Sequence, residues 1–405
     1  MLTAPPEFTA RPVRRPGRIG PLSTTQILVA ELCLVAVVAA GLRGPVPLAV
    51  ASGVAAVLLT VFFARRGHRW WLEHRALVAD HRRRRADAGR TTGAHDRSGS
   101  AAGSGPVLDA LRGLAPGLAV ADVSTADGGT VGVGRDGAGW FSTVALAPDA
   151  PPVPLDTLVG LLAGADQPGV LMQLGTQTVP APSPDVHPSS PAGTSYRQVL
   201  AGLGNAPVPA HRETAISVRI DAYALAEALQ DHTADPEEAA ALVASLARKV
   251  ATGLRRIGVG CRTLDARQLV ALLARSCDVE PGPLATAGAP PAEEWTHWRS
   301  ARLIHRTYWL RTWPAPADGL GSLFAWAATA PAAQTTVTLV IDPSGGTDVA
   351  VRAFVRLATR PDTDLGDLDR VLVDGARRVG ADLLPLDGEQ GPATYATAPT
   401  GGGAG

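Results

Sequence analysis

The amino-acid sequence predicts an α+β protein, with an N-terminal two-helix transmembrane hairpin followed by a mixed sheet-and-helix cytosolic domain. The first observation is an apolar run over residues 25–64, broken only at Arg43-Gly44-Pro45. Each half has about 18–19 residues and would cross a hydrocarbon core of roughly 30 Å. The second observation is that strand-like and helix-like runs alternate over residues 106–392 without a strict βαβ rhythm, which is typical of an α+β domain.

Arginine residues around the hairpin predict its orientation. They precede it within residues 11–18 and follow it within residues 65–85, whereas the connecting turn carries only Arg43. Positive charge stays on the cytoplasmic side, so we expect a multi-pass protein of the cell membrane with both termini in the cytoplasm. A cleaved signal peptide is the alternative for the first helix, but a second full-length span follows it. Residues 1–24 are Pro- and Arg-rich and are expected to be a disordered cytosolic tail.

Small residues on the second helix are candidates for helix packing. Ala49 and Gly53 lie one turn apart, and such pairs let helices approach closely in lipid. In an alanine-rich chain the same spacing also arises by chance. Glu31 is the one acidic residue of the hairpin and lies about one turn from its cytosolic end, within reach of water.

A basic juxtamembrane helix is expected over residues 65–88. Trp70 and Trp71 come just after the apolar run, where indole rings prefer the membrane interface. The helix could contact anionic membrane lipid or a partner, or it could be a simple stop-transfer anchor. Residues 89–105 are rich in Gly, Ser, Thr and Ala and predict a flexible linker. The interaction candidates are Trp70, Trp71, Arg82, Arg83, Arg84 and Arg85.

Composition limits the possible functions. The chain has 405 residues and a formal net charge of zero, which argues against a dedicated nucleic-acid-binding protein. Lys249 is the only lysine, and the abundance of Arg, Ala, Gly and Pro is typical of the high-GC genomes of actinobacteria. The three cysteines form no CxxC pair, so neither a disulfide framework nor a cysteine zinc site is expected.

The cytosolic domain, residues 106–392, is expected to begin with a three-stranded meander whose turns are Asp127-Gly128 and Asp136-Gly137. Asp265 is predicted to cap a helix. Residues 180–209 are loaded with Pro, Ser and Gly and predict a long irregular loop, and residues 393–405 predict a disordered tail. Further strands are predicted over residues 170–179, 212–221, 259–264, 302–313, 334–341, 348–357 and 381–386, and helices over 154–163, 237–256, 265–276, 319–328 and 364–379.

The sequence motifs give no site for chemistry. Gly132-x-Gly134-x-x-Gly137 matches the dinucleotide fingerprint, but it lies between two predicted strands and not before a helix. The chain has no phosphate-binding loop ending in Gly-Lys-Ser/Thr, no His-Glu-x-x-His and no Gly-x-Ser-x-Gly. His297 and His305 are weak metal-ligand candidates, and Asp387 with Glu389 is a weak acid–base pair. We therefore predict no catalytic, cofactor-binding or metal-binding residue and no small-molecule substrate.

Aromatic residues gather in Trp295-Thr296-His297-Trp298 and Thr307-Tyr308-Trp309-Leu310, in a chain with few aromatics elsewhere. Such a cluster belongs either to the core, which is the preferred interpretation, or to an interaction surface.

Several of these features, taken in order, resemble the EccE family of type VII (ESX-type) secretion systems. They are the Arg-rich start, the tight hairpin and the Pro/Ser-rich loop before Ser195-Tyr196, followed by Glu294-Trp295-x-x-Trp298, His305-Arg306-Thr307-Tyr308-Trp309, Thr335-Thr336-Val337-Thr338-Leu339 and Leu386-Asp387-Gly388-Glu389-Gln390. The resemblance covers nearly the whole chain. It implies a non-enzymatic membrane subunit that assembles with EccB, EccC and EccD, where EccC supplies the ATPase. The family has no catalytic residues to carry over.

Two other classes remain open. One is a membrane-tethered enzyme, such as a degenerate transferase that uses residues 180–209 as a lid. The other is a membrane-anchored regulatory or sensor module. An enzyme should show convergent polar residues in a deep pocket, whereas a scaffold should show a broad contact surface.

Overall fold

The computed structural model describes residues 10–12, 18–19, 22–66, 69–95, 105–125, 128–165, 167, 169–180, 189–203, 211–222, 224–225, 235–279, 291–314, 319–343 and 349–403. The chain divides into two compact units. The hairpin unit comprises residues 13–90, and the sheet unit comprises residues 1–12 and 91–405.

The hairpin unit is built on two antiparallel helices, α1 (Thr24–Gly41) and α2 (Pro45–Phe63). Gly44 allows the tight turn between them because its φ of 126° suits glycine, and Pro45 begins α2. At the ends of α1 and α2 that lie away from this turn, the Gln26 side chain of α1 donates a hydrogen bond to the Phe62 carbonyl of α2 at 2.8 Å. The unit also contains β2 (Arg18–Ile19), β3 (Leu22–Ser23), β4 (Arg65–Arg66), β5 (Arg69–Trp70) and the start of α3 (Trp71–His95).

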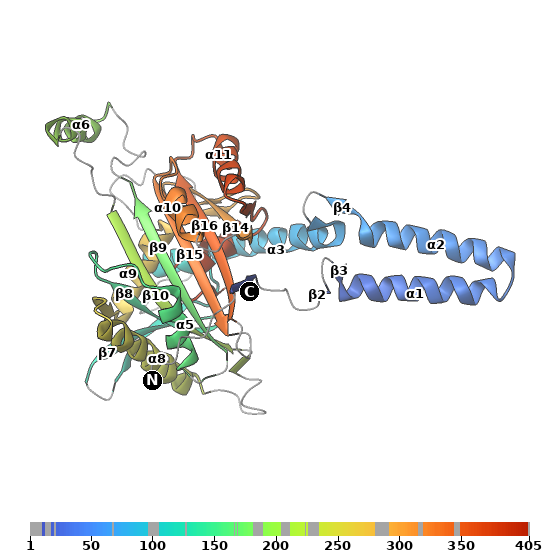
Figure 1. Ribbon diagram of the computed structural model, residues 1–405, viewed down its shortest axis with the longest axis horizontal. Coiled ribbons are helices and arrows are strands. Elements are labelled where there is room, and N and C mark those ends of the chain that lie inside the picture. The colour runs from blue at the N-terminus through green and yellow to red at the C-terminus, as the bar shows by residue number, and fades with distance from the viewer. Residues whose placement is uncertain are drawn as a thin grey trace. The chain divides into compact units, whose positions relative to one another are not determined.

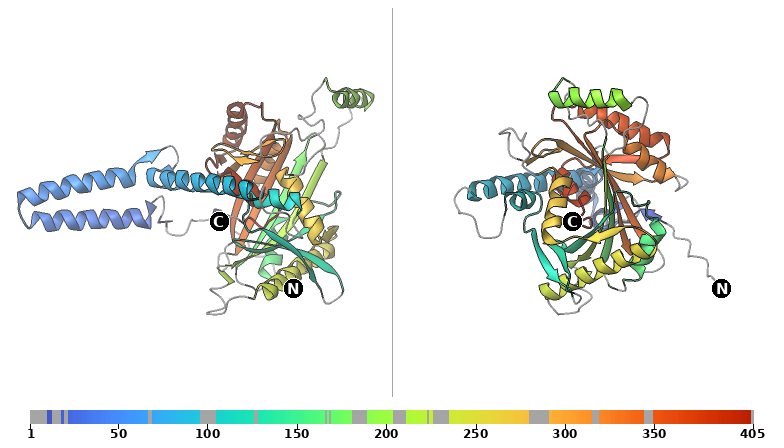
Figure 2. Two further views of the ribbon diagram at one scale, coloured as in Figure 1. Left: turned by 180° about the vertical axis from the view of Figure 1, so that it is seen from behind. Right: turned by 90° about the vertical axis from the view of Figure 1, so that its left-hand side faces the viewer.

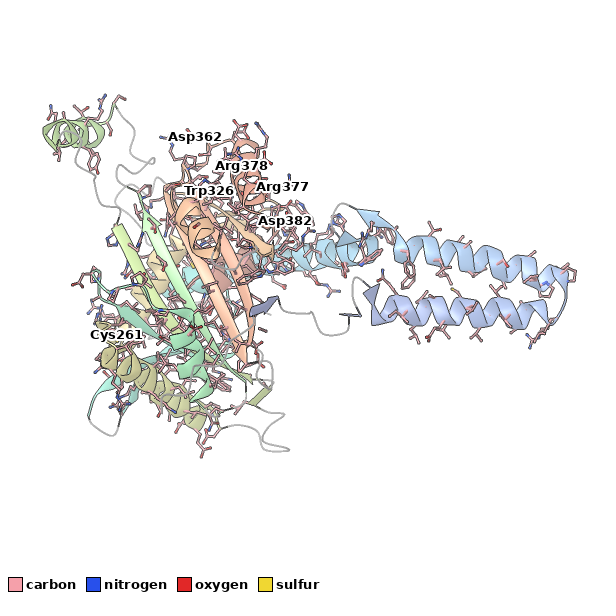
Figure 3. The ribbon with its side chains drawn as sticks, viewed as in Figure 1. Cys261, Trp326, Asp362, Arg377, Arg378 and Asp382 are labelled. Atoms are coloured by element: carbon pink, nitrogen blue, oxygen red, sulfur yellow. The ribbon has the colours of Figure 1, made fainter. Side chains whose placement is uncertain are left out.

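Many apolar side chains of this unit are exposed (Figure 3). Leu42 is 86% exposed and Val46 is 73% exposed, which is unfavourable in water and suits a lipid environment. Within the described residues, α2 is the helix long and apolar enough to cross a membrane, whereas the apolar part of α1, Gln26–Gly41, is shorter. One candidate span is therefore found, and a second span through α1 stays a prediction.

The sheet unit contains one large sheet, which is antiparallel apart from the pairing of β1 with β16 (Figure 1). Its first strands are β6 (Ala119–Ser124), β7 (Thr130–Asp136), β8 (Gly139–Leu146), β9 (Val170–Val179), β10 (His211–Asp221) and β11 (Cys261–Thr263). The later strands are β12 (Ala292–Glu293), β13 (Trp298–Arg299), β14 (Ile304–Thr312), β15 (Gln334–Pro343), β16 (Val349–Thr359) and β17 (Asp382–Pro385), and β1 is Ala10–Pro12. The helices are α4 (Pro106–Arg112), α5 (Leu155–Ala163), α6 (Pro191–Leu203), α8 (Pro236–Arg256), α9 (Ala266–Cys277), α10 (Gly319–Ala327), α11 (Leu365–Arg378) and α12 (Gln390–Thr397).

The two halves of this unit repeat the same order of elements. The first repeat runs from β6 to α9 and the second from β12 to α12. Within the sheet the orders β6-β7-β8-β10-β9 and β12-β13-β14-β16-β15 correspond strand by strand, and β11 and β17 pair with the equivalent strands β8 and β14. The equivalent strands β9 and β15 pair antiparallel with each other, so an approximate two-fold axis passes between them.

The repeat extends to individual residues. Gly253 of α8 and Gly375 of α11 each lie where another helix crosses closely, because a Cβ atom there would collide with Leu161 of α5 or Trp326 of α10 respectively (Figure 3 labels Trp326). Around these glycines, Gly253, Arg255, Arg256, Gly258, Leu264 and Asp265 recur at the same spacing as Gly375, Arg377, Arg378, Gly380, Leu386 and Asp387.

The two faces of the sheet differ in chemistry. One face carries apolar side chains such as Val144, Ile216 and Tyr308, and it packs against α5, α8, α10 and α11. The opposite face, which we call the polar face, carries Thr143, Gln173, Ser217, Arg219, Thr336, Thr338 and Arg356, and it is covered by α4, α9, α12 and the C-terminal residues. Figures 1 and 2 show the helices on both faces.

Most predicted elements are present. The meander β6-β7-β8, its turn at Asp136-Gly137 and the Asp265 capping box are confirmed. Three expectations need correction. Residues 393–403, expected to be part of a disordered tail, belong to α12 and a buried turn after it. Ala10–Pro12 form a strand within the expected disordered N-terminal tail. The expected irregular loop 180–209 contains α6. Helix α3 also runs on to His95, into the expected linker, whose residues 96–104 lie outside the described residues.

Candidate functional site

A group of buried polar side chains lies on the polar face, beneath the C-terminal segment Gln390–Gly403. Arg219 and Arg356 are each 1% exposed, and Gln173 is fully buried. Arg219 and Gln173 come from the neighbouring strands β10 and β9, and Arg356 comes from β16, which is separated from β9 by β15. The strand alternation turns all three toward α12. A polar face of this kind needs hydrogen-bonding partners, because unpaired buried polar groups are costly.

The C-terminal segment supplies those partners from its backbone. Gln173 donates to the carbonyls of Ala396 and Ala398 at 3.0 and 2.9 Å, and its side-chain oxygen accepts from the amides of Gly401 and Gly402. Thr143 donates to the Pro399 carbonyl at 2.9 Å. Thr338 similarly donates to the Thr397 carbonyl at 3.1 Å. Side chains of β8, β9 and β15 therefore bind the main chain of this segment.

Arg219 forms a buried ion pair at one end of the segment. It hydrogen-bonds Asp136 and donates to the Thr400 carbonyl at 3.0 Å, while the Tyr395 hydroxyl donates to Asp136 at 2.8 Å. Burial alone would raise the pKa of Asp136, but the hydrogen bond and charge of Arg219 outweigh it, so the pKa lies below its usual range. Burial and the neighbouring carboxylate raise the pKa of Tyr395, which keeps that hydroxyl neutral. Side chains at Gly401 and Gly403 would collide with Arg219.

Arg356 is held in the same way in the other half of the sheet. It donates to the Thr394 carbonyl at 3.0 Å and to the carbonyl and hydroxyl of Ser276 at 2.8 and 2.9 Å. Burial lowers the pKa of Arg356, and burial raises the pKa of Cys277 nearby. These groups hold the C-terminal segment and Ser276 of α9 against the polar face of the sheet.

A second network joins the aromatic motif to α11. Arg306 forms a bidentate pair with Asp369 at 2.6 and 2.7 Å, and it lies 3.1 Å from Asp387. The Tyr308 hydroxyl also donates to Asp369. Burial raises the pKa of Tyr308, and the hydrogen bond to Asp369 raises the pKa of Arg306 against the effect of its burial. Asp387 and Glu389, the weak acid–base pair of the sequence analysis, thus have separate roles. Asp387 binds Arg306, and Glu389 is the N-cap residue of α12.

The aromatic and histidine motifs belong mainly to the core. Trp298 is 3% exposed and lies 5.1 Å from the His305 ring, and Tyr308 is fully buried. Burial lowers the pKa of His305 well below its usual range, with Arg356 and Arg302 adding to the effect. Among the described residues, no three His, Cys, Asp or Glu side chains gather as a metal site. Trp295 and Trp309 are half-buried.

The glycines of the apparent dinucleotide fingerprint have a structural reason. A Cβ atom at Gly134 would collide with the Phe141 ring, and one at Gly132 would lie about 2.6 Å from the Asp265 backbone. Gly137 lies in the turn between β7 and β8, so the strand–turn–helix context of the fingerprint is not formed here.

The predicted helix-packing residues lie on the outside of the hairpin unit. Ala49 and Gly53 are both exposed, and a Cβ atom at Gly53 would have no heavy atom within 4 Å. The contact between α1 and α2 is made elsewhere, and Cys33 and Ala55 are each 8% exposed. The Ala49–Gly53 ridge is therefore open to other molecules.

The juxtamembrane candidates form stacked pairs at the end of α2. The Arg65 guanidinium lies 4.3 Å from the Trp70 ring centroid, Phe63 meets Trp70 edge-on at 6.0 Å, and Arg75 lies 5.0 Å from the Trp71 centroid. Arg82, Arg83 and Arg85 are exposed and Arg84 is half-buried. Arg83 lies 3.8 Å from Asp80, an exposed pair that adds little stability.

The polar face was not predicted from the sequence. The signal available was the alternation of polar residues within otherwise apolar strands, as in Gln173-x-Gly175-x-Gln177 and Thr336-x-Thr338. The repeat of Gly253 to Asp265 in Gly375 to Asp387 was equally visible.

Two comparisons with known proteins bear on identity. A search of curated proteins gives no match. Against family models, residues 208–310, about a quarter of the chain, match EccE, a family described as "Putative type VII ESX secretion system translocon, EccE".

Proposed function

We propose that this chain is a non-enzymatic structural subunit of a type VII secretion membrane complex. In this proposal α1 and α2 both cross the inner membrane, both termini lie in the cytoplasm, and the sheet unit stands beside the ATPase-bearing subunit. The partners EccB, EccC and EccD follow from the family resemblance, and the match over residues 208–310 supports them.

The observation that carries the proposal is the open ridge on α2. In lipid, apolar side chains gain little by associating, so a subunit is held by close packing of small residues. Ala49 and Gly53 offer such a surface, and α1 does not occupy it. The cationic segment around Trp70, Trp71 and Arg82 to Arg85 provides a second contact, for anionic lipid or for a partner's cytosolic segment.

The assembly test combines both contacts. In Gly53→Leu with Arg82, Arg83, Arg84 and Arg85 all changed to Gln, the chain should stay in the membrane but no longer co-purify with the ATPase subunit. The larger side chain blocks the ridge, and the loss of four charges weakens the second contact. Val54→Leu, one position along the same exposed helix, is the matched control and should co-purify normally. Normal recovery of the multiple variant would place the contact in the sheet unit instead.

Topology is tested separately. A reporter that is active only in the cytoplasm, fused to either terminus, should be active at both, because the arginines flank the hairpin on both sides. Activity at one terminus alone would show that a single helix spans the membrane.

The alternatives of a tethered enzyme or a sensor module are tested on the purified full-length chain. Because the phosphate-binding loop is missing and the Gly132–Gly137 stretch is a hairpin, we expect neither ATP binding nor hydrolysis. Micromolar binding of ATP by calorimetry would contradict the structural role.

A further inference from the structure

The strand β6 forms one end of the large sheet, and its outer edge is open. It pairs with β7 alone, in continuous register over Ala119–Ser124. The Thr125 amide donates to the Gly129 carbonyl across the turn, and backbone bonds alternate along an antiparallel strand. The even-numbered residues therefore turn their amides and carbonyls away from β7: Val120, Asp122 and Ser124. Within the part of the chain that the structure describes, these amides and carbonyls have no hydrogen-bond partner.

The equivalent edge strand of the second repeat is short and covered. β12 has two residues, and its Glu293 side chain accepts from the Gly391 amide of α12 at 3.2 Å. β6 has six residues and lacks the lysine, arginine, proline or bulge that natural proteins place on exposed edge strands. An open edge of this kind is a template for a further strand.

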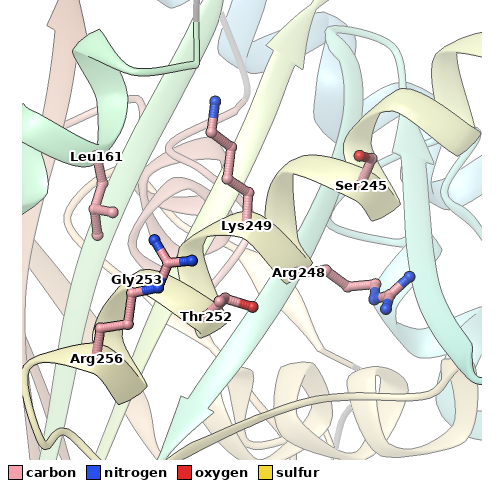
Figure 4. A pocket seen from close by; sticks show the side chains of 7 residues that line it. All are labelled: Leu161, Ser245, Arg248, Lys249, Thr252, Gly253 and Arg256. Atoms are coloured by element: carbon pink, nitrogen blue, oxygen red, sulfur yellow. The ribbon is translucent and has the colours of Figure 1, made fainter.

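The two helices that flank β6 leave this edge open. On one side, the Asp122 carboxylate accepts from the Ala266 amide at the start of α9 at 2.7 Å, and this bond holds the strand against the helix. On the other side, α8 packs against the sheet through buried residues such as Val243 and Ala247. The opposite surface of α8 carries a shallow groove of about 440 Å³ where α5 crosses it, and that groove faces away from the sheet (Figure 4). A strand added beside β6 therefore leaves the contact of α8 with α5 in place.

We propose that β6 pairs with β6 of a second copy of this chain, antiparallel and about a two-fold axis that passes through Ala121. In this register Val120 of one copy lies opposite Asp122 of the other, and each of these pairs exchanges two backbone hydrogen bonds. Val120 and Val123 are half-buried on opposite faces of β6, and the added strand covers both. This inference goes beyond the structural role proposed above and does not depend on it.

The edge is complementary to itself in this register. The two Asp122 carboxylates lie diagonally, about 7–8 Å apart, and each is already bound at the start of α9. An axis at Asp122 would instead place the two carboxylates directly opposite each other, which is destabilising. An axis at Val120 would need the amide and carbonyl of Leu118, which are already hydrogen-bonded. A different protein that donates a strand is the competing occupant, and the test distinguishes it.

Disulfide crosslinking of the full-length chain in isolated membranes tests the pairing. Residues on the axis form a non-hydrogen-bonded pair with Cα atoms about 4.5 Å apart, which is within the range for a disulfide. Ala121→Cys, in a chain with Cys33→Ser and Cys261→Ser, should give a product of twice the chain's mass on oxidation with copper phenanthroline. Ala119→Cys is the matched control, exposed on the same side of the same strand but about 14 Å from its counterpart. It should give at least fivefold less of this product.

Light scattering of the chain purified in detergent gives an independent readout. The unmodified chain should be a dimer, and Ala121→Lys should be a monomer, because a lysine on an edge strand blocks pairing. Val371→Lys, at an exposed position on α11, should remain a dimer. Four results would each overturn the proposal: no crosslink at Ala121→Cys, equal crosslinking at Ala119→Cys, a crosslinked product whose second component is another protein by mass spectrometry, or an unchanged mass of Ala121→Lys.

Discussion

At the scale of single residues, this protein uses buried polar side chains to bind a piece of its own backbone. Gln173 satisfies two carbonyls and two amides of the C-terminal segment from a fully buried position. One side chain thus serves four backbone groups in the interior, of which the Ala398 carbonyl also accepts from the Thr400 amide.

Gln173→Leu should therefore destabilise the protein by about 3 kcal/mol or more, because buried groups left without hydrogen bonds cost about 1–3 kcal/mol each. Gln177→Leu, on the same strand and face but half-buried, should change the free energy of unfolding by less than about 1 kcal/mol. Urea unfolding of the two variants measures the difference. Equal losses would mean that the C-terminal segment does not depend on Gln173.

His305 predicts a pH dependence of stability. Its two ring nitrogens have no hydrogen-bond partner among the described residues, and burial with Arg356 and Arg302 lowers its pKa. The unfolded chain then binds the proton more readily than the folded chain. The contribution of neutral His305 to the free energy of unfolding is therefore complete above about pH 6.5 and is lost as pH falls below it. His305→Phe should reduce the fall in melting temperature between pH 7.5 and pH 5.5. An unchanged pH profile would show that other groups cause the fall.

At the scale of elements, the close crossing of helices depends on one glycine in each repeat. Gly375→Ala would push a methyl group into the rigid indole of Trp326 and should cost about 1–3 kcal/mol. Gly253→Ala meets the mobile end of Leu161 and should cost less. Gly160→Ala on α5 meets no atom within 4 Å and should stabilise by about 0.5–1 kcal/mol. Thermal unfolding of the three variants checks this order, which equal effects would contradict.

The C-terminal segment behaves as an element of the fold even though its sequence is typical of a tail. Its residues are small and give no apolar periodicity, yet Thr394, Tyr395, Ala398 and Thr400 are buried. A stop codon after Glu389 should remove the Thr400 carbonyl from Arg219 and the Thr394 carbonyl from Arg356, and the shortened chain should be degraded or aggregate in cells. A stop after Gly403 removes only the last two residues and is the control. Wild-type levels of the shorter chain would show that the segment is dispensable.

At the scale of the whole molecule, the sheet unit is two copies of one arrangement joined at β9 and β15. The outer faces of their helices differ in sequence: α11 pairs Arg370 and Arg377 with Asp367 and Asp374, whereas α8 has Ser245 and Thr252 at the positions of these two aspartates. The two repeats share packing residues, such as the crossing glycines Gly253 and Gly375, and differ on the outer faces of these helices.

The features that depend on local patterns could be predicted from the amino-acid sequence. The apolar run predicted the hairpin helices, and alternation predicted strands such as β9 and β10 to within a residue. Asp136-Gly137 predicted its turn, and Asp265 its helix cap. Each of these depends on residues close together in the chain, so a single sequence is enough to identify them. The order of motifs also carried the EccE resemblance, which the family match bears out over residues 208–310.

The roles of the buried polar residues and the order of the C-terminal segment depend on contacts between residues far apart in the chain. Gln173 and Thr143 are each separated from their C-terminal partners by more than 220 residues, and nothing local marks those pairs. A Gly- and Ala-rich segment lacks the apolar surface that predicts order, so on composition it should remain disordered. It is ordered because the sheet satisfies its backbone hydrogen bonds, and that energy exists only once strands distant in sequence have come together.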